Sequence, residues 1–422
     1  MKVNSLELMN FRGIEKMSLN FTNQTTAMVG VNGVGKSTVL DALAIALSQL
    51  TWRINGHPQK ARPIAIDDIR LGAEFARITI NVTLRGESVT WSIAVNRRKG
   101  AYSDPMRKSD LEMLNAAVAR LDTEWSHVEE ERQEPYDLPL AVYYDVNRAV
   151  LEIPLRVREQ LRNNPHEAYA DALDHGGADF KRFFIWFRSN EDHENEQRVD
   201  NAGFRNIGLE AVRAAITKFT DFTELRIRRK PLRMTVKKSQ QEFNVGQLSD
   251  GERSVLALVG DLARRLSILN PSQQNPNLGK GVVLIDEIDL HLHPGWQRSV
   301  VAKLEKTFPN CQLVLTTHSP QLVGELLAES VMLMRNGELL GHAERALGLS
   351  SGEVLEELME GKERNVEVDA ALKQIRKGID NDEIEQAQAM LNQLKAKVGE
   401  IPEVLEAQSA IDSLQWLVGA DE

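Results

Sequence analysis

Three patterns in the sequence predict an α/β fold that is built around a glycine-rich loop, with an inserted, mainly helical region and a helical C-terminal tail. The apolar run Thr25–Val29 leads into a loop with three glycines, and apolar residues then recur at helical spacing as far as Leu50. The runs Val282–Ile285 and Gln312–Thr316 are largely apolar, as expected for strands buried on both faces of a sheet. From Gly352 to the end of the chain the pattern is helical.

These patterns divide the chain into four segments. We expect residues 1–95 to form an N-terminal lobe with the glycine-rich loop, and residues 221–350 to form a C-terminal lobe. Residues 96–220 are predicted to be a mainly helical insertion, in which the polar stretch Ser189–Asn201 is expected to be loose. Residues 351–422 are the helical tail.

The composition limits the class of protein. Of the 422 residues, 42% are apolar and 27% are charged, which is typical of a globular protein. The sequence has no apolar run of about 18 residues and no signal-peptide core, so we expect no membrane partner. The single cysteine, Cys311, excludes an intrachain disulfide and favours the cytoplasm. The net charge of −10 argues against non-specific coating of nucleic acid, but it does not exclude a local basic face.

The glycine-rich loop Gly30–Ser37 matches the pattern G-x-x-x-x-G-K-[ST]. Its backbone N–H groups and the N-terminus of the following helix can bind phosphates. Lys36 would reach the β- and γ-phosphates, and the Ser37 hydroxyl would bind Mg²⁺. A chance glycine turn is disfavoured, because a strand precedes the loop and a helix follows it. The predicted nucleotide contacts here are Asn32, Gly33, Gly35, Lys36, Ser37 and Thr38.

Two carboxylates end the apolar run Val282–Ile285. Asp286 can hold Mg²⁺, usually through water, and Glu287 can polarise the water that attacks a phosphate. Taken alone, the pair could equally be solvated acids that cap a strand. The phosphate-binding loop elsewhere in the chain favours the catalytic interpretation.

His318 follows the next buried strand, in the sequence Thr316–Ser319. A lone histidine is more often structural, but this position predicts a side chain beside the γ-phosphate that senses or orients it. His291 and His293 alternate in a way that suggests a metal site. No third and fourth ligand lie near them in the sequence, so a loop that leads into a helix is the better interpretation.

A further phosphate-binding candidate, Leu248–Arg253, opens a helix. Ser249 and the N–H of Gly251, with Glu252 beside them, could bind phosphate at this helix N-terminus. The alternative is an ordinary N-cap, which is common. The motif gains weight from its place after the phosphate-binding loop and before the two carboxylates.

That order of motifs resembles the ABC-type ATPases, in the branch with RecF, the chromosome-maintenance proteins and the OLD nucleases. The resemblance covers Met1–Val95 and Gln241–Gly341. It implies ATP and Mg²⁺ as cofactors and an ABC-type P-loop ATPase head. It also implies that the signature loop of one copy, with Ser249, Gly251 and Glu252, closes over the nucleotide held by a second copy, so that head-to-tail dimerisation gates hydrolysis.

Two details of the resemblance concern single residues. Arg12, in the turn Asn10–Ile14, looks like the family's arginine that approaches the phosphates. Asp250 replaces the first glycine of the Ser-Gly-Gly sequence that is usual in transporters, and this departure is closer to the non-transporter branch. The family's lid glutamine stays unassigned between Gln49 and Gln59.

The short insertion, the His-Pro loop and the helical tail resemble the PtuA-type ATPases of Septu and some retron anti-phage systems. That resemblance implies an oligomeric sensor and scaffold for a separate HNH nuclease of the PtuB type, in some systems with a retron reverse transcriptase and its RNA–DNA. The tail is the predicted docking region. It lacks the glutamate and Asp-x-Asp set of the OLD nuclease module, so we expect no intrinsic nuclease, and ATP hydrolysis that can be slow.

Two alternatives remain. A DNA-repair ATPase of the RecF type would clamp DNA through the basic stretch Arg226–Lys238, although charged residues there could equally protect an exposed sheet edge. A transporter ATPase is disfavoured by the N-terminal turn and by the Ser-Asp-Gly signature. The basic residues are Arg226, Arg228, Arg229, Lys230, Arg233, Lys237 and Lys238.

Overall fold

The structure is a computed structural model, and it divides into two compact units, Met1–Ser350 and Ser351–Glu422. The described residues are 1–55, 61–98, 100, 102–121, 137–146, 165–174 and 180–420.

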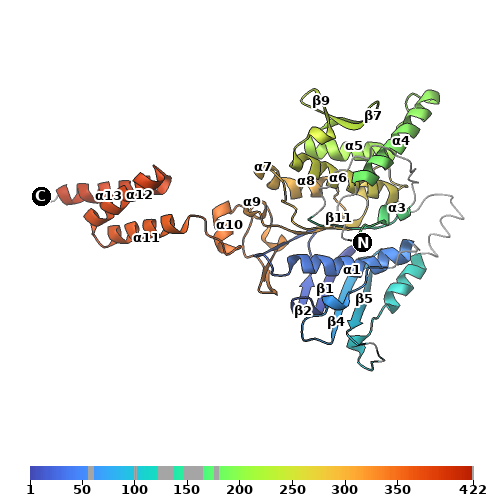
Figure 1. Cartoon of the computed structure of the whole chain (residues 1–422), viewed down its shortest axis with the longest axis horizontal. Helices are drawn as coiled ribbons and strands as arrows, with labels where there is room; N and C mark the ends of the chain where they lie inside the picture. The colour runs from blue at the N-terminus through green and yellow to red at the C-terminus, as the bar shows by residue number, and fades with distance from the viewer. Residues whose placement is uncertain are drawn as a thin grey trace. The chain divides into compact units, whose positions relative to one another are not determined.

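A central sheet of six strands organises the first unit (Figure 1). All its strands run parallel except β13 at one edge. β3, β6, β10 and β11 are buried along their whole length, which explains their apolar sequences. In spatial order the strands are β13 (Glu338–His342), β12 (Val331–Arg335), β3 (Thr25–Val29), β11 (Cys311–Thr316), β10 (Gly281–Ile285) and β6 (Leu140–Tyr144).

Strand β6 lies within residues 96–220, the stretch predicted as an insertion. It pairs in parallel with β10, with Leu140 opposite Gly281 and Tyr144 opposite Ile285. The buried apolar strand of this stretch therefore completes the edge of the central sheet.

A second, antiparallel sheet covers one side of helix α1 (Lys36–Asn55), and the central sheet lies on the other side (Figure 1). Residues Val39–Ser48 of α1 are buried without a break, since the helix packs between two sheets. Trp91 of the antiparallel sheet donates from Nε1 to the Ala46 carbonyl at 3.1 Å. The strands, in order, are β2 (Ile14–Asn20), β1 (Lys2–Phe11), β4 (Phe75–Leu84) and β5 (Glu87–Asn96).

Helices cover the other face of the central sheet (Figure 1). One of them, α6, begins directly after Ser249 and carries the signature sequence at its start. The helices of this unit besides α1 and residues 112–121 are α3 (Pro165–Tyr169), α4 (Phe180–Asp200), α5 (Ile207–Thr220), α6 (Asp250–Leu269), α7 (Pro294–Gln297), α8 (Val300–Thr307) and α9 (Pro320–Val323).

Helix α4 corrects one expectation. The polar stretch Ser189–Asn201 was expected to be loose, but α4 continues to Asp200. Glu194 is fully buried and pairs with Arg213 at 3.0 Å. Glu191 accepts hydrogen bonds from the Ile227 backbone N–H and from Arg229. These buried carboxylates are satisfied by groups from distant elements, so the polar sequence folds as a packed helix.

Helix α6 also carries buried charges. Arg264 and Arg265 both pair with Asp261 at 2.7 Å, and all three side chains are almost completely inaccessible. The Tyr144 hydroxyl donates to Asp261 at 3.0 Å. Arg265 also donates to the Ala168 carbonyl. The ion cluster therefore joins the signature helix to β6 and to α3.

A three-stranded antiparallel sheet follows α5, formed by β7 (Thr223–Arg229), β8 (Leu232–Lys238) and β9 (Gln241–Asn244). Cys311 begins β11 and is 1% exposed. Burial raises the pKa of its thiol to about 12.

The second unit contains α10 (Ser351–Glu357), α11 (Val366–Asp380), α12 (Ile384–Val398) and α13 (Pro402–Ala420). The last three share an apolar core that includes Leu372, Leu391 and Ile411. With 17 acidic and 7 basic residues, residues 351–422 carry a net charge of −10. The whole chain has the same net charge, so residues 1–350 are neutral overall.

Candidate nucleotide-binding site

The predicted catalytic segments follow three neighbouring strands of the central sheet. The phosphate-binding loop follows β3, Asp286 and Glu287 follow β10, and His318 comes two residues after β11, which lies between β3 and β10. Because these strands are parallel, their carboxyl ends meet at one edge of the sheet. The fold therefore brings the three segments together.

The backbone of the phosphate-binding loop requires glycine. Gly33 and Gly35 have φ values of 83° and 100°, which side chains rarely allow. A Cβ atom on Gly30 would lie 2.3 Å from the Met334 carbonyl oxygen. Ser37 is exposed at the start of α1, where its hydroxyl is accessible to a ligand.

Lys36 folds back over the loop. Its ammonium donates to the carbonyls of Gly30 at 2.8 Å and Val31 at 3.1 Å. Burial lowers the pKa of Lys36, while the negative charges of Asp286, Glu287 and other nearby carboxylates oppose that shift. Lys36 therefore lies near several negative charges. When a nucleotide binds, its phosphates would replace the Gly30 and Val31 carbonyls as the hydrogen-bond acceptors of the ammonium.

Thr316 connects the two carboxylate residues. Its hydroxyl donates to Asp286 Oδ1 at 2.5 Å and accepts from the Glu287 N–H at 2.8 Å. Asp286 is buried, and its N–H donates to the Tyr144 carbonyl at 2.8 Å. Glu287 has a φ of 46°, so the chain turns sharply directly after Asp286.

Asp289 supports the segment that carries His318. Asp289 Oδ1 accepts from the Thr317 hydroxyl at 2.6 Å and from the His318 N–H at 3.3 Å. Burial, followed by the positive charge of Lys36, lowers the pKa of His318. Thr316, Thr317 and Asp289 were not predicted as site residues. Their positions could have indicated them, because Thr316 and Thr317 lie in the same short segment as His318, and Asp289 comes two residues after Glu287.

Arg12 is engaged by carboxylates. Its guanidinium donates to Asp41 of α1 at 2.5 Å and to Asp68 at 2.8 Å, and its φ is 51°. Arg62 donates to the other oxygen of Asp41 at 2.9 Å. The turn is therefore tied to α1, the helix that begins at Lys36. The predicted phosphate contact of Arg12 would require it to leave these partners.

The signature loop lines a different surface. Ser249 caps α6, and a Cβ atom on Gly251 would lie 2.5 Å from the His291 carbonyl oxygen. A hollow of about 920 Å³ opens here, and no residue of the phosphate-binding loop lines it. Its lining includes Lys238, Ser249, Gly251, Glu252, His291 and Trp296. In a single copy, the signature loop thus lines a hollow that the phosphate-binding loop does not share.

The histidine pair is a structural loop. His293 Nδ1 accepts from the Gly295 N–H at 3.2 Å and so caps α7, while the His291 backbone contacts Gly251. Among the described residues, no group of three or more His, Cys, Asp or Glu side chains could hold a metal ion.

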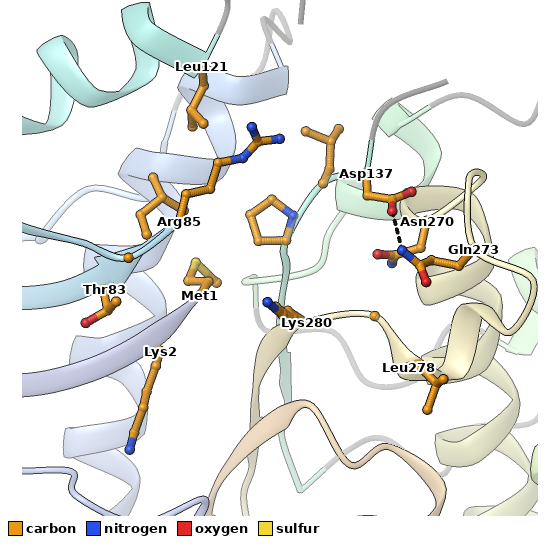
Figure 2. A pocket seen from close by; sticks show the side chains of 15 residues that line it. Met1, Lys2, Thr83, Arg85, Leu121, Asp137, Asn270, Gln273, Leu278 and Lys280 are labelled. Atoms are coloured by element: carbon orange, nitrogen blue, oxygen red, sulfur yellow. Dashed lines mark hydrogen bonds between the residues drawn. The ribbon is translucent and has the colours of Figure 1, made fainter. Parts of the chain in front are cut away.

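A second cavity, of about 710 Å³, lies at the opposite ends of β6 and β10 (Figure 2). Arg85 comes from the β4–β5 turn and Lys280 precedes β10, while Asp137 accepts from Gln273 at 2.7 Å on the other wall. None of the predicted nucleotide contacts line this cavity, so it is distinct from the nucleotide site.

The basic stretch is largely paired with carboxylates. Arg226 and Arg228 both pair with Glu242, and Arg229 pairs with Glu191 and Asp192. Further along, Lys237 pairs with Glu224 and Lys238 with Glu252. This compensation favours a charged, protected sheet edge over a groove for nucleic acid.

The loop, the carboxylates and the histidine at three adjacent strand ends define a nucleotide-binding protein of the P-loop ATPase class. The predicted α/β fold class is confirmed by the sheets described above. A family model described as "AAA domain, putative AbiEii toxin, Type IV TA system" matches residues 25–324. The chain belongs to this family, in the branch of the retron and Septu ATPases.

Three curated relatives support that assignment. The "Retron Ec83 probable ATPase" of Escherichia coli is 31% identical, over 86% of this chain and 77% of the relative. The "Retron Vc95 probable ATPase" of Vibrio cholerae serotype O1 biovar El Tor is 29% identical, over 79% and 73%. "Septu protein PtuA" of Bacillus mycoides (strain KBAB4) is 25% identical, over 85% of this chain and 44% of the relative. The predicted relationship to retron and PtuA-type ATPases is confirmed.

Among solved structures, "Crystal structure of the SmcHead bound to the C-winged helix domain of ScpA" aligns with a TM-score of 0.48 at 17% identity, over 82% of this chain and 99% of that chain. Within the part of the chain that the structure describes, no helix is long and apolar enough to cross a membrane.

Proposed function

We propose that this chain binds and hydrolyses ATP, and that two copies close head to tail around two nucleotides. One observation carries the proposal. The phosphate-binding loop, the carboxylates and His318 converge at one edge of the central sheet, whereas the signature loop lines a separate hollow. A signature loop that does not share its own copy's nucleotide site can serve the site of a second copy.

The residues divide the chemistry among them. Lys36 and the loop N–H groups would bind the β- and γ-phosphates. The Ser37 hydroxyl and the Asp286 carboxylate are the hard oxygen donors that Mg²⁺ prefers, and the ion would neutralise charge on the phosphates when bound. Glu287 would polarise the attacking water, and His318 would contact the γ-phosphate as it leaves. Ser249 and Gly251 would come from the partner copy.

A mixing experiment tests the shared site. Lys36→Ala removes the phosphate-binding lysine and Ser249→Arg blocks the signature loop, so each variant alone should be inactive. In a mixed dimer, the intact phosphate-binding loop of the second variant meets the intact signature loop of the first. Each mixed dimer keeps this one intact site, so mixing should restore turnover, up to about a quarter of the parent value if the copies pair at random. A mixture as inactive as its components would contradict the head-to-tail arrangement.

In the cell, we propose an ATP-gated sensor and scaffold for a separate HNH nuclease in anti-phage defence, assembled as a higher oligomer. The retron and Septu relatives support this role, and a retron partner would add a reverse transcriptase with its RNA–DNA. The acidic unit Ser351–Glu422 is the proposed docking region, because its net charge of −10 suits a basic partner.

Purification with the neighbouring operon product tests the role. Mass measurement of the native complex, with and without ATP, should show several copies of this chain bound to a small HNH protein. Trp416 is 73% exposed on α13, so Trp416→Ala should weaken capture, whereas Leu71→Ala at a 92% exposed site outside the tail should not. A lone ATP-dependent dimer that binds DNA would instead favour the repair-type clamp.

A further inference from the structure

The donors of the signature loop are already occupied in a single copy. The Ser249 hydroxyl donates to Glu252 Oε2 at 2.9 Å, and the Ser249 N–H donates to the same oxygen at 3.0 Å. The Glu252 N–H donates back to Ser249 Oγ at 3.3 Å. Any phosphate that binds Ser249 must therefore displace the carboxylate of Glu252.

A lysine from another element completes the arrangement around this carboxylate. Lys238 ends β8, and its ammonium donates to Glu252 Oε1 at 2.5 Å. A capping box needs only the serine and the glutamate, so the lysine adds something that the cap does not require. Lys238, Ser249 and Glu252 all line the hollow of about 920 Å³, which is open to an incoming group.

The carboxylate is held as an anion. Burial alone would raise the pKa of Glu252, but hydrogen bonds from Lys238 and Ser249 outweigh it and lower the pKa. An oxyanion here receives a hydroxyl, a backbone N–H and an ammonium at the start of a 20-residue helix. The same kinds of donor bind a phosphate oxygen.

We propose that Glu252 occupies the place that the γ-phosphate of the partner copy's ATP takes in the closed dimer, and that Lys238 then transfers from Glu252 to that phosphate. The inference rests on the proposed head-to-tail function and adds Lys238 as a nucleotide-binding residue supplied in trans. Glu252 competes with the phosphate, so it sets the ATP concentration at which two copies close. A nucleoside diphosphate lacks the displacing group and leaves Glu252 in place.

Two substitutions in the full-length chain test the two roles with opposite signs. The background is Glu287→Gln, which slows hydrolysis, and the measured quantity is the ATP concentration for half-maximal dimerisation, by analytical ultracentrifugation. Glu252→Gln keeps a capping-box side chain but removes its charge, and should lower that concentration. Lys238→Ala should raise it about tenfold, the effect of losing one charge-assisted hydrogen bond.

Lys237→Ala is the matched control. Lys237 is the preceding residue of β8 and pairs with Glu224, so its loss should leave dimerisation unchanged. ATP binding by single copies should be equal in all variants, and thermal melting should show that each is folded.

Several outcomes would overturn the inference. If Lys238→Ala lowered the required ATP concentration, the lysine would only pin Glu252. If Lys238→Ala matched Lys237→Ala, or if Glu252→Gln left the concentration unchanged or raised it, Glu252 would be an ordinary helix cap. Failure of the Glu287→Gln parent itself to dimerise with ATP would refute the proposed head-to-tail function, and the inference with it.

Discussion

The phosphate-binding loop and the signature loop both open a helix of 20 residues, yet their charged side chains bind opposite kinds of group. Lys36 donates to backbone carbonyls, whereas Glu252 accepts from hydrogen-bond donors of its own loop. In the first, Lys36 folds onto backbone carbonyls and leaves the loop N–H groups to a ligand. In the second, Glu252 folds onto the N–H and hydroxyl of Ser249. The first loop is therefore suited to bind phosphate in a single copy, and the second must first lose its own anion.

Loss of Lys36 should have the largest effect. Lys36→Ala removes the buried cation and its charge-assisted hydrogen bonds, so ATP affinity should fall at least about 100-fold. Isothermal titration calorimetry measures this, with exposed Lys16→Ala as the control. An ATP affinity within about threefold of the parent value would show that the loop N–H groups bind the phosphates without Lys36. The difference drawn between the two loops would then not depend on their charged side chains.

Glu287→Gln separates binding from hydrolysis. Removing the group that polarises water should reduce turnover by roughly 100-fold or more, while ATP affinity stays near the parent value. Phosphate release and size-exclusion chromatography should show a slow enzyme that accumulates as an ATP-bound dimer. Full turnover in this variant would assign the role to another group.

Ser249→Arg should act only on the second loop. The arginine side chain is larger than serine and carries a positive charge, and it would occupy part of the hollow beside Gly251. Dimer formation and turnover should therefore be lost, while each copy still binds ATP. Ser18→Arg, at an exposed position on β2, is the control. Normal hydrolysis by Ser249→Arg would show that the signature loop is not part of the catalytic site.

His318 should give a smaller, pH-dependent effect. Because its pKa is lowered, the folded protein favours neutral imidazole, so its contribution to stability is full above the unfolded pKa of about 6.5 and declines as the pH falls below it. A nearby γ-phosphate should raise this pKa. ATP binding at pH 6.5 should therefore take up protons, measurable by calorimetry in buffers of different ionisation enthalpy, and His318→Ala should reduce that uptake.

The smallest effect is expected at the basic strands. A DNA clamp predicts salt-dependent binding that is lost on combined Arg228→Glu and Arg229→Glu substitution. Since both arginines already pair with carboxylates, we expect DNA affinity to change less than about threefold. A steep loss at low salt would restore the clamp hypothesis.

The sequence predicted those parts of the site whose function depends on residues that are close together in the chain. Gly30–Ser37 and Val282–Glu287 combine a buried strand with polar residues at its end, so their place in the sheet follows from local pattern. The packing of α4 could not be predicted, because Glu194 is satisfied by Arg213, 19 residues away. The role of Leu140–Tyr144 depended on pairing with β10, far along the chain. Likewise, the contact of Lys238 with Glu252 joins two motifs that were interpreted separately.

The deep position of Cys311 has a practical consequence. A thiol that is 1% exposed, with a pKa of about 12, presents almost no thiolate to maleimide reagents at neutral pH. Cys311 is also the only cysteine of the chain. New cysteines introduced at the signature hollow or on α13 can therefore be labelled with fluorophores or spin probes while Cys311 is kept. Distances measured between the labels on two copies would then report their approach in real time.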